Sequence, residues 1–189
     1  MTRSRITLAA LVAVVVTLPA LAAFHIWRPA PSPRTASSAG AAPSSPGLRG
    51  TDAAWLSLMI AMNESTLVLL DRAAPRLTDP HLATFVTTLV ASHRAELAEM
   101  LGIANRQNVP VTNEHEGHEL PGIVTPADLA RIEASAGPAF DNAVRECLRE
   151  HLEQGARLAG SEQRAGRDDE TRTFAGRIER ARRTDLARM

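Results

Sequence analysis

Hydrophobic positions recur at steps of three and four along most of the chain after residue 50, which is the spacing of helices with one buried face. From 51 to about 73 the inward positions are Trp55, Leu58, Met62, Thr66, Leu69 and Ala73. From 80 to about 105 they are Leu82, Phe85, Leu89, His93, Glu96, Leu97 and Met100. Two further stretches carry Phe140, Val144, Cys147, His151 and Leu158, and then Phe174, Ile178, Arg182, Asp185, Leu186 and Met189. We therefore predict four long helices and no strand.

Start signals agree with this division. Asp79-Pro80 and Thr125-Pro126 each place a capping side chain before a proline at the first helical position. Thr51 or Asp52 is expected to cap the first helix, and Asp168 or Asp169 the last. Thr125-Pro126 opens a short helix to about Ser135, and the third long helix begins near Pro138.

The two halves of the pattern align without a gap. Equivalent pairs are Asp52 with Asp141, Glu64 with Glu153, Asp79 with Asp168, Phe85 with Phe174, Leu97 with Leu186 and Met100 with Met189. We infer a duplicated helical hairpin, with repeat 1 at about 51–105 and repeat 2 at about 138–189. The expected fold is an all-α four-helix bundle over 51–189, with a short helix in the crossover.

The amino terminus has the pattern of an export signal. Arg3 and Arg5 precede an uncharged stretch from Ile6 to Phe24. Residues 1–28 are therefore either a cleaved signal peptide or a single transmembrane anchor, which places the remainder outside the cytoplasm. Residues 29–50, rich in Pro, Ala and Ser, are predicted to form a disordered tether.

Composition narrows the function further. The formal net charge is zero and aromatic residues make up 3% of the chain, which argues against nucleic-acid binding. A single cysteine, Cys147, excludes both an internal disulfide and a paired-cysteine zinc site. The sequence contains no nucleophile–base pairing and no glycine-rich phosphate loop, so we do not expect an enzyme.

One layer of the predicted bundle is chemically distinctive. Met62 and His151 occupy equivalent places in the two repeats, and so do the pairs His93 with Glu96 and Arg182 with Asp185. Helical bundles that bind metals use inward-facing carboxylates and histidines on facing helices. Histidines, and methionines such as Met62 and Met100, are also common as ordinary core residues, so both interpretations remain open.

These residues lie in motifs that resemble the two-repeat, ferritin-like domain-of-unknown-function family 305, and the resemblance implies a ferritin-like four-helix bundle. The repeats of this family typically open with a Met-Ile-x-His-His stretch, which here is Met59-Ile60-Ala61-Met62-Asn63, and Leu148-Arg149-Glu150-His151-Leu152 in repeat 2. Their second helices end in His93-Arg94-Ala95-Glu96-Leu97-Ala98-Glu99-Met100 and Arg182-Arg183-Thr184-Asp185-Leu186-Ala187-Arg188-Met189.

The resemblance implies an exported protein and, because some family members are linked to copper handling through histidine and methionine ligands, copper handling as a candidate role. Imidazole and thioether groups are ligand types that suit copper. Of the four motif histidines only His151 remains, because Met62, Asn63 and Leu152 replace the others. Leu120 and Ile123 stand where the linker of the family has methionines. The expected site is therefore weakened: His93, Glu96, Met62, His151 and Met100 are its candidate ligands, for copper or another divalent metal bound weakly.

The remaining charges suggest why a metal is dispensable. Arg182 is permanently charged and is predicted to face the core, where it pairs with Asp185 and Glu96 and supplies the positive charge of a metal. The alternative function is then an envelope interaction or structural module that binds a protein partner and no metal. His115 and His118, beside three glutamates in the crossover, are a second candidate for weak chelation, or else part of a solvated loop.

Overall fold

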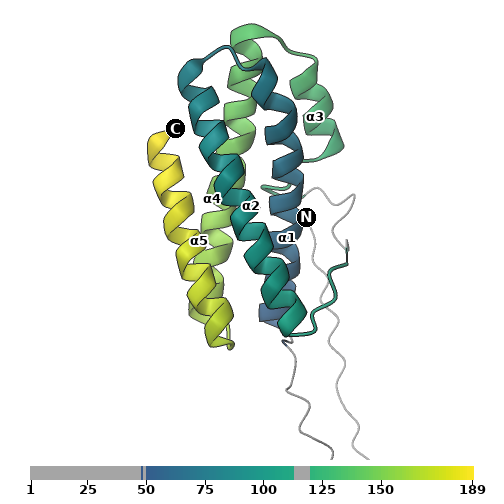
Figure 1. Ribbon diagram of the computed structural model, residues 1–189, viewed down its shortest axis with the longest axis vertical. Helices are drawn as coiled ribbons and strands as arrows, with labels where there is room; N and C mark the ends of the chain where they lie inside the picture. The colour runs from purple at the N-terminus through teal and green to yellow at the C-terminus, as the bar shows by residue number, and fades with distance from the viewer. Residues whose placement is uncertain (1–47, 49, 113–119) are drawn as a thin grey trace, which may run out of the picture. The chain divides into compact units, whose positions relative to one another are not determined.

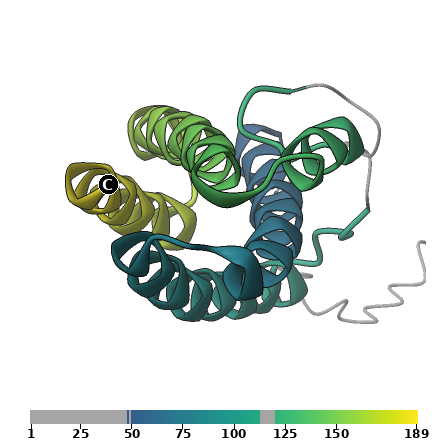
Figure 2. The ribbon, with the colours of Figure 1, turned by 90° about the horizontal axis from the view of Figure 1, so that it is seen from above.

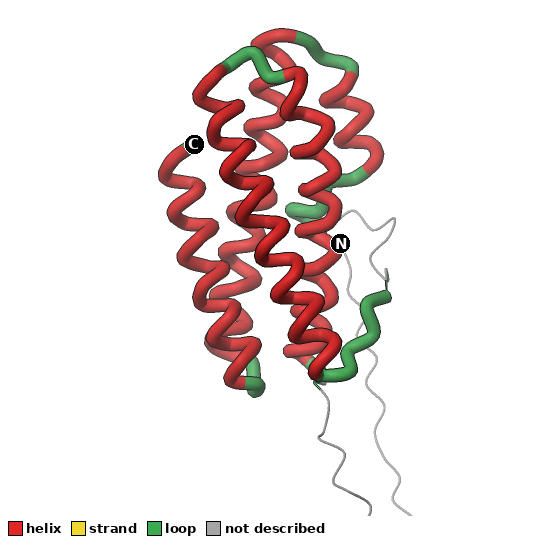
Figure 3. The backbone as a smooth tube through the Cα atoms, viewed as in Figure 1, coloured by secondary structure: helices red, strands yellow, loops and turns green. Residues whose placement is uncertain are grey.

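The computed structural model describes residue 48, residues 50–112 and residues 120–189 of the chain. These residues contain the helices α1 (Thr51–Ala73), α2 (Pro80–Arg106), α3 (Pro126–Glu133), α4 (Gly137–Ala165) and α5 (Asp169–Arg188), with a 3-10 turn, η1 (Ala74–Arg76), after α1. The described part has no strand, and the predicted all-α class is confirmed (Figures 1 and 3). The predicted export signal and most of the tether lie outside the described residues.

The long helices form two antiparallel hairpins, α1–α2 and α4–α5, with α3 packed outside against α4 (Figures 1 and 2). Asp79 caps α2 by accepting hydrogen bonds from the backbone N–H groups of His81 and Leu82. Thr125 and Asp128 make a reciprocal capping box at α3, and Asp168 caps α5. These three starts lie where the sequence places them.

The expected cap of α1 is wrong. Gly50 occupies the N-cap position, and no side chain caps the helix. Asp52 points instead to the turn between α4 and α5, where its Oδ1 accepts hydrogen bonds from the backbone N–H groups of Arg167 at 2.8 Å and Asp168 at 3.0 Å. The carboxylate thus ties the first turn of one repeat to the turn of the other.

Asp141 makes the equivalent connection at the opposite end of the bundle. Its carboxylate accepts from the Thr78 N–H at 3.1 Å, from the Thr78 hydroxyl at 2.6 Å and from the Asp79 N–H at 2.8 Å. Since Thr78 and Asp79 align with Arg167 and Asp168, the two repeats hold each other's turns in the same way. This reciprocal contact supports the duplication that the sequence pattern predicts.

The hydrophobic core consists of two clusters along the bundle. One contains Leu70, Leu82, Phe85, Leu89, Phe140, Val144 and Leu148, near the η1 turn. The other contains Trp55, Met59, Met62, Met100, Ile103, Phe174 and Ile178, near the start of α1. Buried polar side chains lie between them, which places a polar layer at mid-height.

The helix α1 is apolar enough and, with η1, long enough to cross a membrane, by composition and length alone. In the bundle, however, 56% of its most apolar window is buried among the other helices. Because the other core helices cover it in this way, its hydropathy is explained by a central position in the core.

The cross-repeat tie generates a stability prediction. Replacing Asp141 with alanine removes the acceptor of two backbone N–H groups and one hydroxyl, and hydrogen bonds to an ionised group each contribute about 1.5–3 kcal/mol. Because three such bonds are lost, we expect Asp141→Ala to lower the free energy of unfolding by about 4 kcal/mol or more in urea titrations. Asp71→Ala, which removes an exposed ion pair with Arg94, is the control and should change it little. Equal effects of the two substitutions would contradict a stabilising contact between Asp141 and the Thr78–Asp79 turn.

Candidate functional site

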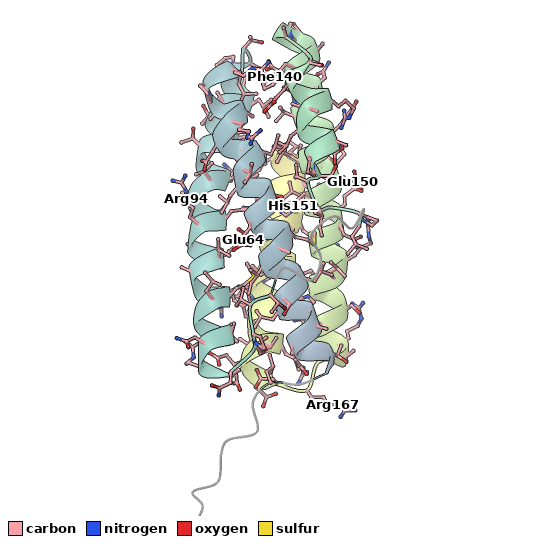
Figure 4. The ribbon with its side chains drawn as sticks, turned by 90° about the vertical axis from the view of Figure 1, so that its right-hand side faces the viewer. Glu64, Arg94, Phe140, Glu150, His151 and Arg167 are labelled. Carbon is pink, nitrogen blue, oxygen red and sulfur yellow. The ribbon has the colours of Figure 1, made fainter. Side chains whose placement is uncertain are left out.

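Two buried histidines meet in the polar layer. His93 on α2 and His151 on α4 are 0% and 1% exposed, and their Nε2 atoms lie 3.0 Å apart. Figure 4 shows His151 between the helices, about midway between Phe140 near one end and Arg167 at the other. The layer therefore connects the two repeats at the centre of the bundle.

The second nitrogen of His151 fixes the protonation of the pair. Its Nδ1 lies 3.1 Å from the carbonyl oxygen of Gly122 and 2.8 Å from the Thr66 hydroxyl. A carbonyl only accepts, so Nδ1 of His151 carries the hydrogen, and in the neutral ring Nε2 is then the acceptor. The hydrogen between the rings consequently belongs to Nε2 of His93. This leaves Nδ1 of His93 as a buried atom without a hydrogen-bond partner in the described structure.

Gly122 is shaped for this contact. Its φ of +82° lies in the left-handed region, and a Cβ there would approach the Gln154 Cβ to 2.7 Å and the Met62 Cε to 2.8 Å. The neighbouring Val124 N–H donates to the Ser65 hydroxyl oxygen at 3.2 Å. The segment before α3 therefore crosses close over α1 and α4 and presents a carbonyl to His151.

Arg182 is the buried charge of the layer. Its side chain is fully buried, and its Nη1 and Nη2 donate to the two carboxylate oxygens of Glu96 at 3.1 and 2.6 Å. Room for the guanidinium comes from Gly155 on α4, since a Cβ at that position would lie 3.3 Å from the Arg182 Nε. Gly155 aligns with Thr66 of the first repeat. At this position repeat 1 therefore supplies the Thr66 hydroxyl to the histidine pair, and repeat 2 supplies space for the Arg182 side chain.

Asp185 is not a hydrogen-bond partner of Arg182 in the structure. Its nearest cation is the Arg188 Nη1 at 4.0 Å, and burial raises the pKa of its carboxyl despite the Arg182 and Arg188 charges. The two-carboxylate arrangement expected around Arg182 is therefore replaced by a bidentate pair with Glu96 alone.

Both histidines are held neutral. Burial is the main cause, and the charge of Arg182 adds to it, so that the pKa of His151 falls to about 3. The pKa of His93 is lowered well below its usual value by burial, by Arg182 and by His151. The layer as a whole repels an additional positive charge.

The other candidate ligands are placed as follows. Met62 and Met100 are buried in the cluster near the start of α1, with exposures of 1% and 0%. His115 and His118 lie outside the described residues. Within the ranges that the structure describes, no group of three or more His, Cys, Asp and Glu side chains is arranged to hold a metal ion.

Sequence reasoning missed two participants of the layer, Gly122 and Gly155. Asn63 is 1% exposed, and neither its Oδ1 nor its Nδ2 has a hydrogen-bond partner among the described residues. Gly155 could have been found from its alignment with Thr66. A glycine at an inward-facing position where the other repeat has a side chain leaves space for a larger neighbour.

The fold and the polar layer define a two-hairpin, all-helical bundle with a histidine pair and a buried ion pair at its centre. A family model described as "Domain of unknown function (DUF305)" matches residues 103–189. This match confirms the resemblance inferred from the motifs.

Two solved structures have the same fold. One is a DUF305 protein from Streptomyces coelicolor, predicted to be secreted; it is 13% identical, has a TM-score of 0.65, and the match covers 73% of this chain and 88% of that one. The other is a DUF305 fragment from Deinococcus radiodurans, 14% identical with a TM-score of 0.68, covering 75% and 94%. At these identities the likeness establishes the fold alone. None of the curated proteins matches this chain.

The neutral histidine pair generates a pH prediction. Between the folded-state pKa of about 3 and the ordinary value of 6.5, the unfolded chain binds a proton that folded His151 does not. Its contribution to stability is therefore complete above pH 6.5 and is lost as the pH falls, by about 1.4 kcal/mol per pH unit. Unfolding free energies measured from pH 6 to pH 4 should fall less steeply, by about that slope, in His151→Gln than in the unaltered protein. The control His81→Gln, at an exposed position, should show the same pH dependence of the unfolding free energy as the unaltered protein. If His151→Gln also shows that pH dependence, a neutral buried His151 is excluded.

Proposed function

We propose that this protein is an extracytoplasmic, non-enzymatic bundle that serves as an interaction or structural module and whose central layer is completed by an arginine in place of a metal. The observation that carries the proposal is the burial of Arg182 in a bidentate pair with Glu96 beside the two histidines. An extracytoplasmic location is supported by the export pattern of residues 1–28 and by the related Streptomyces coelicolor protein that is predicted to be secreted.

The electrostatic argument is direct. A buried carboxylate needs a positive partner, and the guanidinium of Arg182 provides one that is permanently charged and geometrically matched. The same charge lowers the pKa of both histidines, and the interaction that opposes a proton on a ring nitrogen also opposes a metal cation there. In this protein the layer then fixes the register of the four helices without a cofactor.

A second candidate is weak copper handling, and the His93–His151 contact favours it. Both Nε2 atoms face each other, and the Nδ1–H of His151 donates to a backbone carbonyl, as in histidines that bind metals through their other nitrogen. The two Nε2 atoms would hold copper in place of the hydrogen between the rings, Met62 and Met100 are the candidate thioether ligands, and Glu96 is already paired with Arg182.

Metal analysis and titration of the purified exported domain separate the two candidates. We expect the unaltered protein to be purified without stoichiometric copper and to give little heat when copper is added in a calorimeter. Arg182→Gln removes the opposing charge while keeping a hydrogen-bond donor, so it should bind copper at least tenfold more tightly, which corresponds to about 1.4 kcal/mol.

Arg180→Gln, at an exposed position two residues away on α5, is the matched control and should behave as the unaltered protein does. Tight copper binding by the unaltered protein, unaffected by Arg182→Gln, would remove the proposal and favour metal handling. A metal-free protein that captures a defined envelope partner would support it.

A further inference from the structure

A second buried polar cluster lies at the end of the bundle where α1 begins. Asp52 on α1 and Glu162 in the last turns of α4 are 3% and 2% exposed, and their carboxyl groups lie within hydrogen-bonding reach of each other. With both carboxyl groups ionised, the buried Oε1 of Glu162 has no hydrogen-bond partner in the described structure. Gly166 lies over both, because a Cβ there would collide with the Glu162 Oε1 and lie 2.9 Å from the Asp52 Oδ1. A hydrogen bond between two carboxyl groups requires that one of them carries a proton.

The equivalent carboxylate at the opposite end of the bundle, Asp141, has one more hydrogen-bond donor than Asp52. There Asp141 receives three donors: the Thr78 N–H, the Thr78 hydroxyl and the Asp79 N–H. Asp52 receives the two equivalent backbone donors, from Arg167 and Asp168. The residue equivalent to Thr78 is Arg167, which has no hydroxyl and is exposed, so it does not supply the side-chain donor that Thr78 gives to Asp141.

We propose that the protonated carboxyl of Glu162 is this third donor, and that the proton shared with Asp52 is a latch that holds the first turn of α1 against the turn between α4 and α5. In repeat 1 the position equivalent to Glu162 is Ala73, so the latch belongs to one end of the bundle only. The inference concerns residues outside the central polar layer and does not depend on the proposed function.

The charges around Glu162 decide which carboxyl holds the proton. Asp52 from α1 and Asp168 from the start of α5 are acidic and raise the pKa of Glu162, and the cation Arg172 on α5 acts in the opposite direction. Burial, followed by the hydrogen bond and the charge of Asp52, raises the pKa of Glu162 to about 7. For Asp52 the N–H donors of Asp168 and Arg167 outweigh burial and lower the pKa, so Asp52 is the ionised member.

Loss of the proton leaves two buried carboxylates side by side near a third. The two carboxylates repel each other, and they can separate only if Asp52 moves away from the turn. That movement breaks the hydrogen bonds from the Arg167 and Asp168 N–H groups. This end of the bundle is where the chain enters α1, and Figure 4 shows Arg167 at this end. The latch is therefore closed in mildly acidic conditions and weakens as the pH rises toward neutrality.

Amide hydrogen exchange of the full exported domain tests the latch residue by residue. Folded Glu162 has its pKa at about 7 against an ordinary 4.5, so the stability it contributes is complete below pH 4.5 and is lost as the pH rises through about 7. Protection factors of the Arg167 and Asp168 amides, corrected for intrinsic exchange, should fall about tenfold per pH unit, or up to about 100-fold between pH 5 and pH 7. The Thr78 and Asp79 amides at the other end are the internal control and should not show this fall.

Two variants make the outcome decisive. Glu162→Gln keeps a donor that does not titrate, so protection of Arg167 and Asp168 should no longer depend on pH in this way. The double variant Glu162→Ala with Arg167→Thr transfers the hydroxyl of the other end and should do the same. Exposed Glu153→Gln should leave the pH dependence intact. A pH dependence that persists in either test variant, or that is equal at both ends of the unaltered protein, would overturn the proposal.

Discussion

The structure depends on the neutralisation of one buried charge. Arg182 lies at the centre of the bundle with no exposed side-chain surface, and an isolated guanidinium there would be strongly destabilising. Glu96 on α2 supplies the opposite charge in a bidentate contact, and Gly155 on α4 supplies the space. Three helices are thereby held at one relative height, and the neighbouring histidines are constrained to be neutral.

Much of this arrangement was accessible from the sequence. The three-and-four spacing, the capping residues before Pro80 and Pro126, and the alignment of the two halves predicted the helices and their class. The same alignment brought His93, Glu96, His151 and Arg182 to one level. Such features are local or periodic, so they can be read without knowledge of distant contacts.

The rest could not be predicted because it depends on contacts between segments far apart in the chain. Asp52 looked like a helix cap, yet it binds the backbone of a turn more than a hundred residues later. The carbonyl of Gly122 orients His151 only because the crossover passes over α1 and α4. Glu162 sits among charged residues in the sequence, and only the fold shows that it is buried against Asp52.

The glycines of the second hairpin have a consequence for how the bundle comes apart. Gly155, Gly160 and Gly176 let α4 and α5 approach so closely that side chains of one helix fill the surface of the other. Between α2 and α5, by contrast, long side chains span the distance, in the pairs Arg106–Glu170, Arg177–Glu99 and Arg182–Glu96. The α4–α5 hairpin is thus held by close helix packing, whereas the seam between α2 and α5 is held in large part by ion pairs, two of them exposed and therefore weakened by salt.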